Sequence, residues 1–256
     1  MIEAKSPGEL ETMDRANRVV RQILGELVER VRPGVSTGEL NQYAEKRLSE
    51  LGAGPAFKGY PHPDGGPSYP AVLCTSINEE VVHGIPSPQR TLREGDILSL
   101  DFGAVIDGLY GDAAVTVPVG KIGETAARLI DVTRTSLMKG IEQVQAGNRV
   151  FDIAAAVQGH VEANGFSVVR SFVGHGIGRR LHEDPPVPNF VDRGPNPRLT
   201  AGMVLAIEPM IAAGDYEIEM AAYRWTAMTR DRALAAHFEL SVAVTPEGPW
   251  VLGEPA

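Results

Sequence analysis

Apolar residues recur at every third or fourth position in two early stretches of the chain, which is the spacing of a helix with one buried face. The first stretch runs from Met13 to Val31 and follows Ser6-Pro7-Gly8-Glu9, a capping box with proline at the first helical position. The second stretch follows the same kind of signal, Ser36-Thr37-Gly38-Glu39, and stops at Gly52. The pattern therefore predicts two amphipathic helices.

The pattern then changes to strand-like apolar runs as far as about residue 118, and afterwards the whole order is repeated. Helical spacing returns over 123–145 and 149–163, and strand-like runs follow. Strands joined by tight turns are antiparallel. We therefore predict an α+β fold in which the chain 1–256 is one domain of two similar halves. The approximate bounds of the halves are 1–120 and 121–256.

One predicted hairpin, DFGAVIDGLYGD, begins at Asp101 and ends at Asp112, although carboxylates are unfavourable in strands. A two-residue turn at Asp107-Gly108 places Gly103 opposite Asp112 and leaves Asp101 on the same face. Such diagonal neighbours have backbones ~7–8 Å apart, so the two acids repel unless one is protonated or a cation lies between them. We expect the missing side chain at Gly103 to leave room for that ion; a wet sheet face is the alternative.

Three further residues could complete a metal site. His175 lies among glycines in VGHGIG, while Glu208 and Glu239 interrupt apolar strand patterns, and a buried acid needs a partner. Each has a plain alternative, such as a turn histidine or an acid on an edge strand. Together with Asp101 and Asp112 they form an oxygen-rich set with one nitrogen, which suits two divalent ions.

Composition narrows the class of protein. The 256 residues carry a net charge of -9 without a basic block, which argues against a nucleic-acid surface. No apolar run approaches the ~18–20 residues of a membrane span, and the first residues are charged where a signal peptide would be apolar. The single cysteine, Cys74, excludes an internal disulfide. We therefore expect a cytoplasmic protein without membrane or nucleic-acid partners.

Five segments of the sequence carry a recognisable set of motifs: INEEVVHGIP (77–86), GDILSLDFGAVIDGLYGDAAVT (95–116), GHGIGRRLHEDP (174–185), GMVLAIEPM (202–210) and HFELSVAVT (237–245). In order and spacing they resemble those of the type I methionine aminopeptidases, a branch of the M24 metallopeptidases. The resemblance covers essentially the whole chain, and it implies the "pita-bread" fold, in which two pseudo-symmetric halves form a curved antiparallel sheet covered by helices.

The resemblance implies a dinuclear centre of two divalent ions, which could be Co, Mn, Fe(II) or Zn. Its ligands would be Asp101, Asp112, His175, Glu208 and Glu239, with Asp112 and Glu239 bridging. A hydroxide held by the ions would attack the scissile carbonyl, and Glu208 would also act as the general base.

The resemblance also assigns two substrate histidines. His83 would address the nitrogen at the scissile bond, and His182 the carbonyl oxygen that gains charge in the transition state; loop histidines bonded to backbone are the alternative. The other three histidines have no matched role, and we expect them in a loop, on a helix and on a strand surface: His62, His160 and His237. His237 stands where many relatives have glutamine, and Leu240 where they often have histidine.

An apolar pocket with aromatic walls would bind the methionine side chain. By resemblance its walls are Phe57, Tyr60, Tyr69, Cys74, His83, Leu181 and Trp225. Two features depart from the family: Leu181 replaces a common phenylalanine, and PHPDGG (61–66) lengthens the loop after Tyr60. Cys74 could equally be a small buried residue or a contact of the pocket. No neighbouring base that would activate it as a nucleophile can be identified from the sequence.

The implied activity is removal of the N-terminal methionine from nascent polypeptides with a small second residue, by a monomer, with the ribosome as a candidate setting. Two alternatives stay open. An aminoacyl-proline hydrolase of the same fold would share the five ligands but usually carries a large additional N-terminal domain. A non-catalytic binding protein of this fold usually has substituted ligands, and none of the five is substituted here.

Overall fold

The computed structural model describes residues 2–222 and 225–254, and its helices lie where the sequence predicts them. They are α1 (Pro7–Val28), α2 (Thr37–Glu50), α3 (Glu124–Glu142) and α4 (Val150–Ala163). Both predicted capping boxes form: the Glu9 carboxylate accepts from the Ser6 amide at 2.8 Å, and the Glu39 carboxylate from the Ser36 amide at 2.8 Å. The local start signals therefore set the first residues of α1 and α2.

Antiparallel pairing dominates the strands, as expected. In the described residues, a nine-stranded sheet has the order β1-β4-β5-β14-β9-β7-β8, with β2 paired to β4 and β15 paired to β14. Its strands are β1 (Gly54–Pro55), β2 (Leu73–Ile77), β4 (Ile97–Ile106), β5 (Leu109–Pro118), β7 (Gly174–Gly176), β8 (Glu183–Val187), β9 (Val204–Ile207), β14 (Glu239–Thr245) and β15 (Gly248–Val251).

Two small sheets complete the described strands, in the orders β13-β10-β6 and β11-β12-β3. Their strands are β3 (Glu80–Val82), β6 (Ser167–Val168), β10 (Met210–Ala212), β11 (Ile218–Met220), β12 (Ala227–Thr229) and β13 (Ala235–His237). None of the described helices is both long enough and apolar enough to cross a bilayer.

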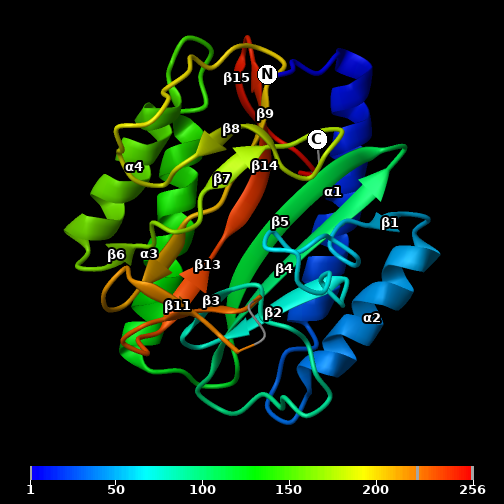
Figure 1. Cartoon of the computed structure of the whole chain (residues 1–256), viewed down its shortest axis with the longest axis vertical. Coiled ribbons are helices and arrows are strands. Elements are labelled where there is room, and N and C mark those ends of the chain that lie inside the picture. Colours follow the sequence, from blue (N-terminus) through cyan, green and yellow to red (C-terminus); the bar gives the residue numbers. More distant parts are fainter. Residues whose placement is uncertain (1, 223–224, 255–256) are drawn as a thin grey trace.

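The two halves meet in the large sheet. Figure 1 shows α1 and α2 on one side and α3 and α4 on the other, with the curved strands between them. Residues such as Val20 and Ile23 of α1 pack with Phe102 of β4, and Ile153 of α4 packs with Leu205 of β9. The halves join where β5 pairs with β14. This shared sheet supports our proposal that the chain is one domain of two halves.

The hairpin of β4 and β5 has the predicted register, with Gly103 opposite Asp112. Asp107 and Gly108 have φ angles of 49° and 76°, as a two-residue type I′ turn requires. The missing side chain at Gly103 also has a packing role. A Cβ built there would lie 2.7 Å from Ala56 Cβ, 2.9 Å from the Phe57 ring and 3.3 Å from Asp112 Oδ1, so Ala56 and Phe57 pack directly against this strand. The room that Gly103 leaves for an ion stays a prediction.

This close packing predicts that Gly103→Ala lowers the free energy of unfolding by about 1–3 kcal/mol, because the added methyl overpacks a rigid contact. Gly159→Ala in α4 is the matched control, since a Cβ there meets nothing within 4 Å. It should raise stability by about 1 kcal/mol through helix propensity. Urea unfolding measures both, and a Gly103→Ala protein as stable as the parent would contradict the packing argument.

Candidate metal centre and substrate pocket

Neighbouring strands of the large sheet bring the five predicted ligands together. Asp101 lies on β4, Asp112 on β5 and Glu239 on β14, while His175 lies on β7 and Glu208 directly follows β9. These strands are adjacent in the order β4-β5-β14-β9-β7. Because each contributes a side chain to the same face, acids from both halves of the chain meet over the middle of the sheet.

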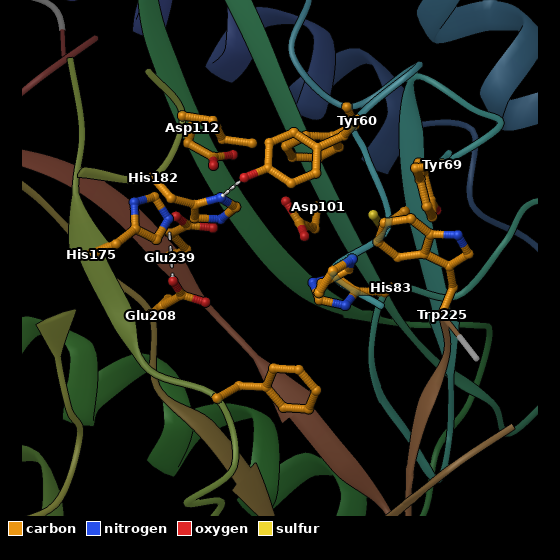
Figure 2. A pocket seen from close by; sticks show the side chains of 15 residues that line it. Tyr60, Tyr69, His83, Asp101, Asp112, His175, His182, Glu208, Trp225 and Glu239 are labelled. Atoms are coloured by element: carbon orange, nitrogen blue, oxygen red, sulfur yellow. Dashed lines mark hydrogen bonds and ion pairs between the residues drawn. The ribbon is translucent and has the colours of Figure 1, made fainter. Parts of the chain in front are cut away.

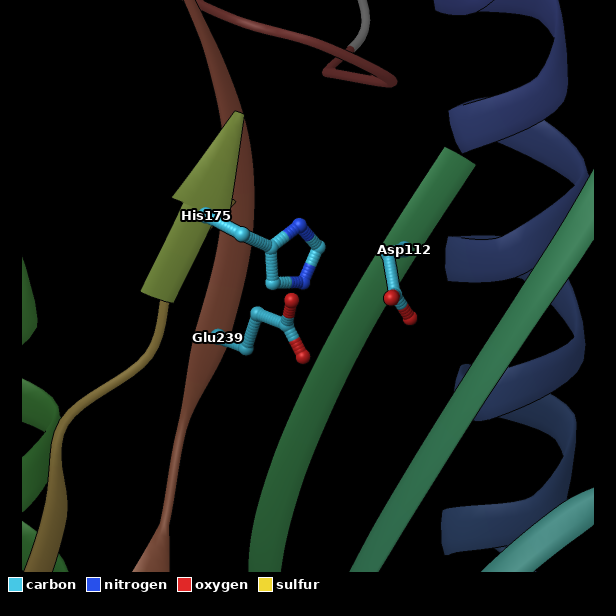
Figure 3. A group of neighbouring side chains, drawn as sticks. All are labelled: Asp112, His175 and Glu239. Carbon is cyan, nitrogen blue, oxygen red and sulfur yellow. The ribbon is translucent and has the colours of Figure 1, made fainter. Parts of the chain in front are cut away.

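Two overlapping groups of side chains could each hold an ion. One atom each of Asp112, His175 and Glu239 lies within 4.8 Å of the others, and Figure 3 shows these side chains pointing toward one another from three strands. Glu208, His237 and Glu239 form the second group with the same limit. His175 Nε2 lies 3.5 Å from Glu208 Oε1 and so links the two. Glu239 belongs to both groups.

Burial rules out the alternative that the hairpin acids sit on a wet sheet face. Asp101 is 9% exposed and Asp112 is 4% exposed. Burial raises the pKa of Asp101 to about 7, with a smaller upward contribution from Glu208. It raises the pKa values of Asp112, Glu208 and Glu239 well above their usual range, and neighbouring carboxylates add to the shift for Asp112 and Glu239. Without a cation, burial and the neighbouring carboxylates therefore favour the protonated forms of these acids.

The donor set fits divalent cations. Among the described residues, buried Asp101 Oδ1, Asp112 Oδ1 and Glu239 Oε1 make no hydrogen bond. Unpaired buried oxygens are costly, and a cation would satisfy all three. Burial, followed by the neighbouring His182, lowers the pKa of His175 to about 3, so its imidazole is neutral and able to bind a metal. Carboxylates with one imidazole suit Mn, Fe, Co or Zn.

Figure 2 shows the two predicted substrate histidines apart from each other: His182 lies beside His175, and His83 lies on the far side of Asp101. The His182 ring centroid is 4.3 Å from that of His175, and His182 Nδ1 forms a 2.5 Å hydrogen bond with the Tyr60 hydroxyl. His83 has a positive φ of 59° and packs edge-on against Phe172 at 5.5 Å. Burial lowers the pKa of His83 to about 4, so it too is neutral.

A cavity of about 300 Å³ opens onto the acids. All of the predicted wall residues line it, together with the five predicted ligands and His182. Cys74 is both buried and a cavity contact, and burial raises the pKa of its thiol well above the usual range, which leaves it a poor nucleophile. Pro63 and Phe172 also line the cavity, and neither was predicted as a wall residue. Phe172 stands three residues before His175, which was the available signal.

One of the three unassigned histidines differs from expectation. His62 lies in its loop as predicted, but it is buried and its ring packs edge-on against Trp225 at 4.8 Å. The expectation of a strand-surface position for His237 is wrong, since its side chain is 2% exposed and its Nε2 lies 3.6 Å from Glu208 Oε2. His160 is on α4, as expected. His237 is two residues from Glu239, and that spacing could have indicated a shared strand face.

The model of metallopeptidase family M24 matches residues 11–246. The chain belongs to family M24. It is 48% identical over 252 residues to a methionine aminopeptidase of Clostridium acetobutylicum, with 98% of each chain covered. It is 45% identical to methionine aminopeptidase 1 of Bacillus subtilis, with 97% of each covered.

Solved M24 structures confirm the pita-bread fold. The crystal structure of a methionine aminopeptidase from Thermotoga maritima has a TM-score of 0.94 at 42% identity, covering 100% of both chains. An Xaa-Pro dipeptidase from Bacillus anthracis has a TM-score of 0.77 at 20% identity, covering 99% of this chain and 62% of that one. At that identity the second likeness concerns the fold alone. Membership of M24 and the clustered acids together establish divalent-metal binding.

Because the pKa values of the acids are raised in the metal-free protein, we predict that metal binding releases protons. Mn²⁺ or Co²⁺ must displace protons from Asp112, Glu208 and Glu239, whose pKa values are raised in the metal-free protein. The apparent affinity should therefore rise as pH increases from 6 to 8. Isothermal titration in two buffers of different ionisation enthalpy measures the released protons. The same heat in both buffers would mean that the acids are already ionised.

Proposed function

We propose that the chain is a methionine aminopeptidase that removes the N-terminal methionine from peptides and nascent proteins, with preference for a small second residue. The observation that carries the proposal is the cavity, because its apolar and aromatic walls lead directly to the clustered acids. A thioether packs well against aromatic rings, and the acids at the pocket's end are where the scissile bond would lie. High identity to the two methionine aminopeptidases named above supports it.

Asp101, Asp112, His175, Glu208 and Glu239 would hold two divalent ions, with Asp112 and Glu239 as the bridging pair. The ions would be Co, Mn, Fe(II) or Zn. When bound, they would supply Lewis acidity and an activated water as nucleophile. The membership of Glu239 in both groups of side chains supports its assignment as a bridging ligand.

Glu208 is assigned a second role as the general base. Its side chain is 12% exposed, whereas that of Glu239 is 3% exposed, so Glu208 has more access to the cavity. Burial raises the pKa of Glu208 well above its usual range in the metal-free protein, which favours proton uptake by this carboxylate.

His182 would donate to the carbonyl oxygen as charge develops on it, and Tyr60 would hold His182 for that task. Burial raises the pKa of the Tyr60 hydroxyl, so the hydroxyl keeps its proton. We assign this hydroxyl as the donor in its hydrogen bond with His182 Nδ1. Burial also lowers the pKa of His182, so the ring is neutral. A neutral imidazole that accepts at Nδ1 carries its proton on Nε2. We therefore assign Tyr60 as a positioning residue that fixes the donor tautomer.

His83, on the far side of Asp101 (Figure 2), would address the nitrogen at the scissile bond. Phe57, Tyr60, Tyr69, Cys74, His83, Leu181 and Trp225 would surround the methionine side chain. The Tyr69 hydroxyl donates to the carbonyls of Leu73 and Gly84 at 3.2 and 3.0 Å, which directs its ring rather than its polar end to the cavity. Action in the cytoplasm on nascent chains, by a monomer and with the ribosome as a candidate setting, belongs to the same proposal.

Substrate selection separates this proposal from its alternatives. Protein loaded with Mn²⁺, Co²⁺ or Fe²⁺ should cleave Met-Ala-Ser and spare peptides that begin with Leu or with Met-Leu, because the pocket suits an unbranched side chain. The measurement is release of the first amino acid by chromatography. Equal cleavage of Ala-Pro would support the aminoacyl-proline hydrolase, and no turnover with any of the ions would support a non-catalytic binding protein.

If the Tyr60 hydroxyl fixes the tautomer of His182, Tyr60→Phe should lower kcat roughly tenfold with little change in KM. The ring stays in this variant, while the hydrogen bond to His182 is lost. Tyr110→Phe, a partly buried tyrosine of the same apolar cluster, is the control and should match the parent. In a His182→Ala background, Tyr60→Phe should cause no further loss. Multiplicative losses in the double variant would show that Tyr60 acts independently of His182.

A further inference from the structure

We infer that His237 is an additional ligand of the metal centre and binds, through Nε2, the ion held by Glu208 and Glu239. This inference rests on the metal centre of the proposed function, but not on the identity of the peptide substrate. It gives each of the two groups of side chains an imidazole: His175 in the group with Asp112, and His237 in the group with Glu208.

The distances fit a shared ion. His237 Nε2 lies 3.6 Å from Glu208 Oε2 and 4.0 Å from Glu239 Oε2. Nitrogen and oxygen ligands about 2.1 Å from one ion are roughly 3 to 4 Å from each other. The same separations are too long for hydrogen bonds. The three side chains are therefore spaced as ligands around a cation.

The environment of His237 leaves its Nε2 without another function. The side chain is 2% exposed, and Nε2 makes no hydrogen bond within the described part of the chain. Leaving a buried polar atom unpaired costs about 1–3 kcal/mol. A cation at this point would satisfy the nitrogen and also separate the facing carboxylates of Glu208 and Glu239.

The backbone holds His237 in this position. Its amide donates to Thr116 Oγ1 at 2.8 Å, and its carbonyl accepts from the same hydroxyl at 2.8 Å. Thr116 lies on β5, four residues after Asp112, and His237 also pairs with Met210 of β10. Two neighbouring strands therefore fix the residue that carries the imidazole, so that little ordering is needed when a metal binds.

The chemical consequence is a centre with two imidazoles and four carboxylates. Nitrogen donors favour Zn, Fe and Co relative to Mn, for which oxygen ligands suffice. An imidazole at position 237 would thus shift the metal preference of this chain toward those metals without altering the five ligands implied by the resemblance.

X-ray absorption at the zinc edge tests the inference, with two equivalents of Zn²⁺ on the parent, His237→Gln and His160→Gln. Scattering from imidazole should correspond to one ring per zinc on average in the parent and to half a ring per zinc in His237→Gln. The affinity for the second Zn²⁺, measured by competition with a chelator, should fall roughly 10- to 100-fold. His160→Gln, on α4, is the control and should match the parent.

The outcomes separate the two proposals. The same imidazole content and affinity in His237→Gln as in the parent would overturn the role of His237 and leave the proposed function intact. Failure of the parent to bind two zinc ions would count against the dinuclear centre itself. Tight binding of the first Zn²⁺ and an unchanged circular dichroism spectrum in His237→Gln would establish that this variant is folded, so that loss of the second site can be attributed to the missing ligand.

Discussion

Repulsion among buried carboxylates is the constraint on which this structure depends. Asp101, Asp112 and Glu239 are all buried, and Glu208 is largely so, within one small region of the sheet. Their negative charges come from both halves of the chain, so the pairing of β5 with β14 holds together groups that would repel when ionised. Protons relieve this repulsion in the metal-free protein, and divalent cations relieve it more completely. A divalent cation would thus stabilise the pairing of these strands as well as supply chemistry.

Much of the architecture could be predicted from local signals. The capping boxes at Ser6 and Ser36 and the Asp107-Gly108 turn are encoded within a few residues, and the turn fixes the register that aligns Asp112 with Gly103. The candidate site was harder to predict from periodicity alone. Hairpin geometry placed two acids together, and interrupted strand patterns suggested Glu208, Glu239 and the glycine-flanked His175 as further ligands. The role of each ligand came only from a resemblance to a family.

The features that local signals did not predict have a common physical cause, which is packing between segments distant in the sequence. Nothing in the hairpin sequence indicates that Ala56 and Phe57 pack where a side chain at Gly103 would lie. His237 was expected on a strand surface, whereas it lies on β13 of a small sheet with its Nε2 3.6 Å from Glu208 Oε2. The contacts of the loop 61–66 and of the residue after it also depend on a distant segment. The Trp225 indole donates to the Pro67 carbonyl at 2.9 Å, and His62 packs against the same ring.

The contact between Gly103 and Phe57 has a consequence for protein engineering. Phe57 is a wall of the cavity, and the backbone it rests on belongs to the strand that carries Asp101. A larger or smaller wall residue at position 57 would therefore displace that strand and, with it, a ligand position. Libraries that vary the pocket to accept other side chains should therefore vary positions 56 and 57 together. They should be screened for metal content as well as for substrate, because substrate preference and metal binding both depend on this contact.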